Sequence, residues 1–349
     1  MTASDSGSIP RPLPVLDAVT QTHPFIYRFI PERYAAIAEI LVDDDAFFEK
    51  LHSLDRKIKR SVGQPETIQP DDLALYSAAA KICGIEPPAI EPRGGLTTDS
   101  LRPGFARTRD AVLPLMKFFL EVGHGLKAVV ARPAPSNRPR VRRALLDAIR
   151  DHISDIQPSV LYYVTMAEPD AEGMTIKSPS GSETIRLTNP GFRKFFRAPL
   201  RETDDQEYEE FESGNPLING DSVSRPRLFV AYCTTIGPAI DRIASDAAVS
   251  GDIATALFVN AIGAGAADAV AEDLNLFLNE IYLPTTPYAK TGAKFRRLSP
   301  GYGGWDLSDQ RPLDALLDFS KIGVRLSDDH VMYPEKSTTG IMGLKFRQT

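Results

Sequence analysis

The sequence is poor in cysteine. It holds two cysteines among 349 residues, Cys83 and Cys233, and both lie in apolar surroundings rather than at paired spacings. A disulfide framework and a thiolate metal site both need more cysteines at closer spacing, so neither is supported. We therefore predict two buried free thiols and no metal centre.

The sequence also lacks long apolar runs and an excess of positive charge. No stretch approaches the about 18 uninterrupted apolar residues of a membrane span, and residues 1–14 lack the basic start and apolar block of a secretory signal. The 40 Lys and Arg residues against 46 Asp and Glu residues give a net charge of −6, which does not favour nucleic acid or anionic membrane as a partner. We predict a soluble, cytoplasmic protein.

The composition is that of a folded protein. Hydrophobic residues make up 42% of the chain and charged residues 25%, close to globular averages. A chain of 349 residues exceeds the usual size of one domain, so one large or two ordinary domains are expected.

Apolar periodicity predicts a helical N-terminal region. We expect a flexible arm over residues 1–15, followed by a mostly helical region over residues 16–150 whose role the sequence does not indicate. One helix is expected from Pro31 and another from Pro70 to Cys83. Residues 86–107 are rich in proline and glycine, which favours neither a long helix nor a central strand.

A run of arginines begins the last expected helix of this region. Arg140, Arg142 and Arg143 fall near its N-terminus, where the helix dipole disfavours cations by a few tenths to about 1 kcal/mol each. The run is either a solvated basic face or a docking site for an acidic partner or a phosphate.

The remaining residues, 151–349, form the second expected domain. Residues 160–164, 184–187 and 227–235 have the β-branched and apolar pattern of strands. Residues 238–249 and 251–282 follow as helices, and the second contains a run of small residues typical of a closely packed core helix. Its glycines do not form the G-x-G-x-x-G pattern of a dinucleotide site.

The densest cluster of unusual residues lies at 296–306. Three glycines and a proline force an irregular backbone there, and its amide and carbonyl groups can meet a ligand. Arg297 supplies a planar fork that suits a carboxylate or a phosphate, and Tyr302 and Trp305 supply aromatic surface. This pattern fits either a site for a small anionic ligand or a tight structured turn.

The same segment resembles a known motif. Arg297-Leu298-Ser299-Pro300-Gly301-Tyr302 is similar to the R-x-x-P-G-Y motif of the S-adenosylmethionine-binding activation domain of cobalamin-dependent methionine synthase. Its continuation to Trp305 resembles the free-standing members of that family, and the resemblance extends over residues 223–346. The other similar segments are Thr234-Thr235-Ile236-Gly237, Asn260-Ala261-Ile262-Gly263, Asp309-Gln310, Ile322-Gly323-Val324-Arg325-Leu326 and Met332-Tyr333-Pro334-Glu335-Lys336-Ser337 through Gly340-Ile341.

This resemblance implies a fold and a set of ligand contacts. The implied fold is α+β, with a helical N-terminal region followed by an antiparallel sheet flanked by long helices. Arg297 would pair with the carboxylate of S-adenosylmethionine, and the backbone at Ser299 would contact the adenine. Pro300 is also expected among the ligand-binding residues, Gly301 would allow close approach, and Tyr302 would line the sulfonium side. Ser337, in the segment that ends at Gly340, would adjoin the same site.

The resemblance also implies a role without catalytic side chains. The chain lacks the Asp-x-His-x-x-Gly loop of corrinoid binding and a cysteine cluster for zinc, so cobalamin is expected only on a partner protein. The leading hypothesis is a component of methionine biosynthesis that supports reductive methylation of cob(II)alamin on a separate corrinoid methyltransferase, with a flavodoxin-like electron donor. Two alternatives stay open: a corrinoid-independent enzyme that transfers from or cleaves S-adenosylmethionine, and a module that senses the ligand or binds a partner.

Overall fold

The structure is a computed structural model with two compact units. It describes residues 16–19, 30–43, 46–86, 96–129, 138–170, 172–177, 184–189, 227–286, 288–289, 291–302 and 304–345. A sheet unit comprises Met1–Phe25, Pro158–Thr235 and Leu274–Thr349, and a helical unit comprises Ile26–Gln157 and Ile236–Asp273. The units therefore interleave along the chain, whereas the sequence suggested one boundary near residue 150.

The helical unit contains the expected N-terminal helices together with helices from the C-terminal half. Its described helices are α1 (Pro31–Asp43), α2 (Phe47–Arg60), α3 (Pro70–Ile82), α4 (Thr98–Val129), α5 (Arg138–His152) and α7 (Ala239–Val249), with the first part of α8 (Ile253–Phe277). The small residues of α8 allow close helix packing, as predicted. A Cβ at Gly265 would lie 2.6 Å from the carbonyl oxygen of Phe118 in α4. Only glycine allows the two backbones to approach this closely.

Helix α4 corrects one prediction. It begins at Thr98, inside the segment that was expected to be irregular, and contains Pro103 and Pro114. The helix start is fixed by the Thr98 amide, which donates to the carbonyl of Glu66 at 2.9 Å. Pro103 is the sixth residue of the helix, so it lacks the amide that would have bonded to the Asp99 carbonyl. Residues 87–95 of the same segment, like the arm over residues 1–15, lie outside the described residues.

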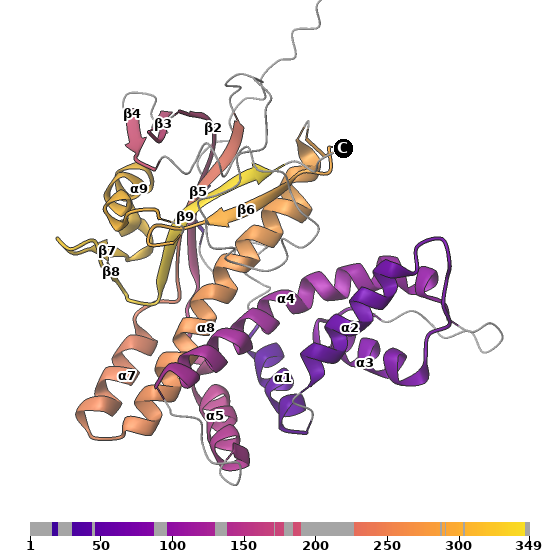
Figure 1. Ribbon diagram of the computed structural model, residues 1–349. Helices are drawn as coiled ribbons and strands as arrows, with labels where there is room; N and C mark the ends of the chain where they lie inside the picture. The colour runs from indigo at the N-terminus through magenta and orange to yellow at the C-terminus, as the bar shows by residue number, and fades with distance from the viewer. Residues whose placement is uncertain are drawn as a thin grey trace, which may run out of the picture. The chain divides into compact units, whose positions relative to one another are not determined.

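The sheet unit is built on an antiparallel sheet. Its strands run in the order β4 (Thr184–Leu187), β3 (Met174–Lys177), β2 (Ser159–Pro169), β5 (Arg227–Thr235), β9 (Ser337–Lys345) and β6 (Lys294–Leu298), and β1 (Leu16–Val19) also pairs with β2 (Figure 1). A separate pair consists of β7 (Arg325–Leu326) and β8 (Met332–Tyr333). The mixture of helices with an antiparallel sheet is the α+β class that was expected.

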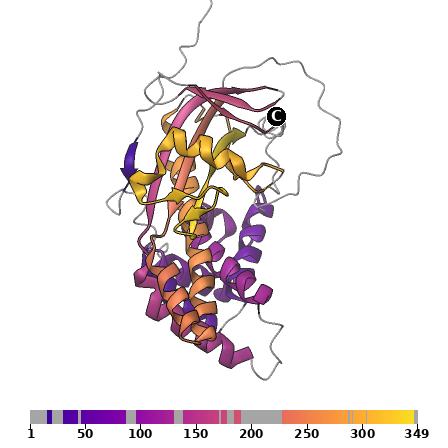
Figure 2. The same ribbon diagram turned by 90° about the vertical axis from the view of Figure 1, so that its left-hand side faces the viewer.

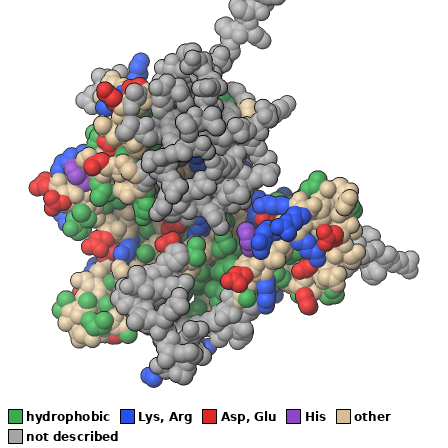
Figure 3. Space-filling model, in the orientation of Figure 1, with side chains coloured by type: hydrophobic (Ala, Val, Ile, Leu, Met, Phe, Trp, Pro, Cys, Tyr) green, Lys and Arg blue, Asp and Glu red, His purple; other side chains and the backbone are tan. Residues whose placement is uncertain are grey.

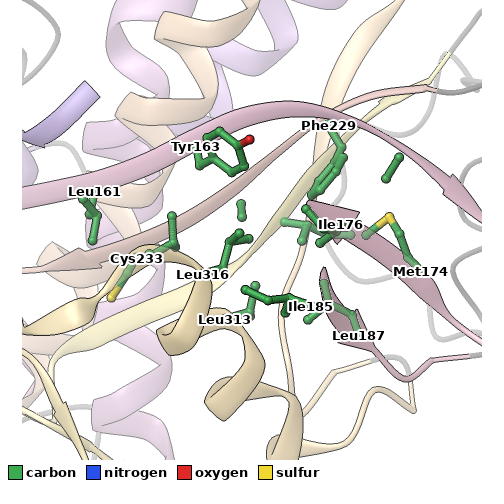
Figure 4. Close-up of a cluster of buried hydrophobic side chains, with 14 of the residues drawn as sticks. Leu161, Tyr163, Met174, Ile176, Ile185, Leu187, Phe229, Cys233, Leu313 and Leu316 are labelled. Carbon is green, nitrogen blue, oxygen red and sulfur yellow. The ribbon is translucent and has the colours of Figure 1, made fainter. Parts of the chain in front are cut away.

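One face of this sheet packs against α9 (Gln310–Leu317). Figure 2 shows α9 lying over the sheet, and Figure 4 shows its Leu313 and Leu316 among side chains from the strands. We call this the α9 face and define it by Leu161, Phe229, Cys233, Leu298 and Ile341, all of which belong to or pack against one buried hydrophobic cluster.

The other face carries tyrosines. The register pairs Tyr162 with Tyr232, Tyr232 with Gly340, and Met342 with Arg297, and side chains of paired residues point to the same side. The ring of Tyr162 meets Phe277, at the end of α8, with centroids 6.2 Å apart. We call this the tyrosine face and define it by Tyr162, Tyr232, Arg297 and Met342.

Both cysteines are free and buried, as predicted. Burial raises the pKa of Cys83 to about 11 and raises the pKa of Cys233 well above its ordinary value. Thiolate is the reactive form of cysteine, so neither residue should react with a thiol reagent at neutral pH while the chain is folded. Titration with Ellman's reagent should show two thiols only after unfolding, and prompt reaction of either one in the native protein would contradict the observed burial.

One helical stretch among the described residues is long and apolar enough to cross a membrane, by length and composition alone. It spans Ile253–Thr285, and half of its most apolar window is buried inside the protein. The core helix of a soluble protein passes the same test, so this stretch is weak evidence for a membrane span.

Candidate functional site

The motif that resembles the activation domain begins on an edge strand. β6 pairs with β9 on one side only, and η4 (Leu278–Tyr282) provides polar partners for its other side. The Asn279 side chain accepts a hydrogen bond from the amide of Phe295 at 2.7 Å and donates to its carbonyl at 3.3 Å. This side-chain pairing satisfies open edge groups and fixes the strand that carries Arg297.

Arg297 and its neighbour Arg296 lie on opposite faces of β6. Side chains alternate along a strand, so Arg297 shares the tyrosine face and Arg296 shares the α9 face with Leu298. Both arginines are half-buried. Only Arg297 therefore lies on the same side as Tyr232, and Arg296 is its natural control.

The glycine turn, residues 299–305, follows β6. The Tyr232 hydroxyl lies 3.0 Å from Ser299 Oγ, which places the start of the turn on the tyrosine face. Within the turn, the Gly301 amide donates to the Trp305 carbonyl at 2.7 Å, the Trp305 amide to the Tyr302 carbonyl at 3.0 Å, and the Tyr302 amide to the Ser299 carbonyl at 3.2 Å. Gly303 lies outside the described residues.

These bonds correct one expectation for the turn. The sequence suggested backbone amides available to a ligand, but the amides of Gly301, Tyr302 and Trp305 are all used inside the turn. The Ser299 carbonyl keeps a second lone pair, since a carbonyl oxygen can accept two hydrogen bonds. The Ser299 carbonyl can thus accept one further hydrogen bond at this point.

Two glycines shape the surroundings of the turn. Gly301 has a φ of +91°, in the region that glycine adopts without strain. Gly340, on β9, lies where a Cβ would collide with the Leu298 carbonyl oxygen and come within 2.9 Å of Ser299 Oγ. The end of β6 can approach β9 only because residue 340 has no side chain.

Most of the expected ligand residues are neighbours in the sequence. Arg297, Ser299, Pro300, Gly301 and Tyr302 follow one another along β6 and the turn. Pro300 is buried, and the Tyr302 side chain is 52% exposed, as a residue facing a ligand or solvent would be.

Ser337 lies apart from the turn. It begins β9, three residues and therefore roughly 10 Å before Gly340. Its hydroxyl lies 2.9 Å from Thr235 Oγ1 and 2.7 Å from the Pro334 carbonyl oxygen. Gly340 is thus the member of the Ser337 segment that reaches the glycine turn.

Tyr232 is the site residue that sequence reasoning missed. It lies inside an apolar run, where it reads as core, and it is separated from Ser299 by 67 positions. Only the pairing of β5 with β9, and of β9 with β6, brings its hydroxyl to the turn.

The predicted docking arginines lie on α5, in the helical unit. Arg140 is exposed, and the exposed Arg143 lies 3.4 Å from Asp147, one turn further along α5. The side chain of Arg142 lies outside the described residues. Figure 3 shows further Lys and Arg side chains on the helical unit, where α2 presents exposed basic residues at Arg56, Lys59 and Arg60.

No group of three or more His, Cys, Asp or Glu residues in the described part of the chain is arranged to hold a metal ion.

Comparisons with known proteins found similarity to solved structures but not to a family model or a curated protein. No family model matches the chain, and no curated protein matches it. The chain is similar to the crystal structure of the MetH reactivation domain bound to AdoHcy, at 15% sequence identity with a TM-score of 0.45. The likeness covers 66% of this chain and 74% of that chain.

Proposed function

We propose that the chain binds S-adenosylmethionine at the end of β6 and serves as a reactivation protein for a separate corrinoid methyltransferase. The observation that supports the proposal is that Arg297 and Ser299 lie on the same face of the sheet as Tyr232, and that the glycine turn follows Ser299 directly.

Each part of the ligand has a matching group in this arrangement. The guanidinium of Arg297 is the planar fork that a carboxylate prefers. The Ser299 carbonyl offers an acceptor for the adenine amine. The exposed ring of Tyr302 offers a face to the sulfonium cation, an attraction worth about 0.5–2 kcal/mol.

The chemistry of the proposed step is a reductive methyl transfer. The S–CH₃ bond of S-adenosylmethionine breaks, a methyl–cobalt bond forms on the partner's cob(II)alamin, one electron comes from a flavodoxin-like donor, and S-adenosylhomocysteine leaves. This chain would bind and orient the methyl donor, which needs no general acid or base. The arginines Arg140, Arg142 and Arg143 are the proposed docking residues for an acidic partner surface.

A consumption assay separates this function from its alternatives. The full chain is incubated with methyl-labelled S-adenosylmethionine in three ways: alone, with reduced flavodoxin, and with reduced flavodoxin plus a cob(II)alamin-loaded corrinoid protein. Reactivation predicts formation of S-adenosylhomocysteine only in the third mixture, with the label on cobalt. Consumption in the first mixture would establish a corrinoid-independent enzyme, and binding without consumption in every mixture would establish a sensing module.

A further inference from the structure

A buried carboxylate near the glycine turn has no part in the proposed ligand contacts. Asp309 is 4% exposed and lies at the end of η6 (Leu307–Asp309). Its Oδ2 accepts a hydrogen bond from the indole Nε1 of Trp305 at 2.7 Å and another from the backbone amide of Thr188 at 2.6 Å. Burying a carboxylate costs free energy unless it is hydrogen-bonded. The bonds from Trp305 and Thr188 offset that cost for Asp309.

The two donors come from opposite edges of the sheet. Trp305 ends the turn that follows β6, and Thr188 follows β4, and these are the first and last strands in the sheet order. One carboxylate oxygen therefore links the segment after β6 to the segment after β4, although four strands lie between β6 and β4 in the sheet. Trp305, Leu187 and Leu313 also belong to the same hydrophobic cluster, so the join is made inside the core of the unit.

Trp305 connects this carboxylate to the ligand surface. Its indole ring is 1% exposed, whereas its backbone bonds to Gly301 and Tyr302 and so closes the turn. If the indole moved, the carbonyl and amide that hold Gly301 and Tyr302 would move with it. The position of the turn thus depends on the indole, and the indole depends on Asp309.

We propose that Asp309 is a positioning residue: by holding the Trp305 indole and the Thr188 amide on one oxygen, it fixes the glycine turn for ligand binding and couples that turn to the end of β4. This inference rests on the proposed function for the identity of the ligand. The coupling itself rests only on the two hydrogen bonds and on the burial of Asp309 and Trp305.

The sole tryptophan of the chain makes the coupling measurable. In the full ¹⁵N-labelled chain, Trp305 gives a single indole cross-peak. The affinities of three variants are compared with that of wild type. Asp309→Asn keeps the size and one acceptor oxygen but removes the charge, and Trp305→Phe keeps an aromatic ring but removes the donor. The third variant is Asp306→Asn. Asp306 is the matched control because it is exposed and its carboxylate accepts from the Ser308 amide instead.

We expect Asp309→Asn and Trp305→Phe to lose S-adenosylmethionine affinity through the same contact. Asp309→Asn and Trp305→Phe should each weaken binding about fivefold or more, the double variant should lose little beyond either one, and Asp306→Asn should bind as wild type does. In wild type, addition of the ligand should shift the Thr188 amide together with the indole cross-peak. Wild-type affinity in Asp309→Asn, or a Thr188 amide that does not respond, would overturn the proposal.

A pH titration without ligand keeps the test independent of the proposed function and of how well a variant folds. Burial raises the pKa of Asp309 above its ordinary value, and Asp306 nearby adds to the rise. As the pH is lowered from neutral, the wild-type indole and Thr188 peaks should move with one shared midpoint, and that midpoint should lie above the pKa of an ordinary aspartate. Separate midpoints, or no movement, would refute the coupling even if the ligand binds. If the peaks move together but wild type binds no S-adenosylmethionine, the proposed function fails and the coupling stands.

Discussion

Replacing Arg297 by alanine is expected to weaken S-adenosylmethionine binding by about 30-fold to about 4,000-fold. Truncating one partner of a buried, hydrogen-bonded charge pair costs about 2–5 kcal/mol, and each 1.4 kcal/mol is about tenfold in affinity. The loss should appear mainly in the dissociation rate, because a buried contact holds the ligand once it has entered. Calorimetric titration of the two proteins measures the difference.

Arg296→Ala is the matched control for this experiment. It removes the same side chain from the adjacent position of β6 but from the α9 face, so it should change affinity less than about threefold while leaving the charge of the protein the same as in Arg297→Ala. An equal loss in both variants would mean that general charge, not a fork on the tyrosine face, attracts the ligand. A loss in Arg296→Ala alone would place the ligand on the other face of the sheet.

Replacing Gly340 by alanine is expected to lower both the free energy of unfolding and the ligand affinity. The added Cβ would collide with the Leu298 carbonyl oxygen, which is backbone and cannot rotate away, and would press on Ser299 Oγ. Overpacking of this kind costs about 1–3 kcal/mol or more. Relief would require β9 to separate from β6, and this separation would displace the start of the glycine turn.

Thr338→Ala serves as the control for Gly340→Ala. Thr338 lies two residues earlier on the same strand, is half-buried, and loses only a small polar side chain on substitution. Chemical unfolding and ligand titration of both variants measure the two effects. If Gly340→Ala keeps wild-type stability and affinity, the close approach of β6 to β9 is not needed for the site.

Local elements of this fold could be predicted from the sequence because their causes are local. The apolar period of α1 and α2, the start and stop signals of α3 and the apolar, β-branched run of β5 each lie within a short window. The glycine turn could also be predicted, because glycine and proline impose irregular backbone wherever they cluster.

The rest depends on contacts between distant parts of the chain. The membership of α7 and most of α8 in the helical unit is a matter of packing, which no window of sequence shows. The join between Trp305 and Thr188 spans more than a hundred positions, so the buried role of Asp309 could not be read from its motif. The start of α4 was not predicted because proline ordinarily ends or kinks a helix, and Pro103 lies only five residues after Thr98.

The proposed function requires that Arg297, Ser299 and the glycine turn bind S-adenosylmethionine. The most direct test is calorimetric titration of the wild-type chain with S-adenosylmethionine, with S-adenosylhomocysteine added as a competitor. We expect saturable binding of one ligand per chain that the competitor displaces. Absence of saturable binding, or binding that the competitor leaves untouched, would contradict the proposed function.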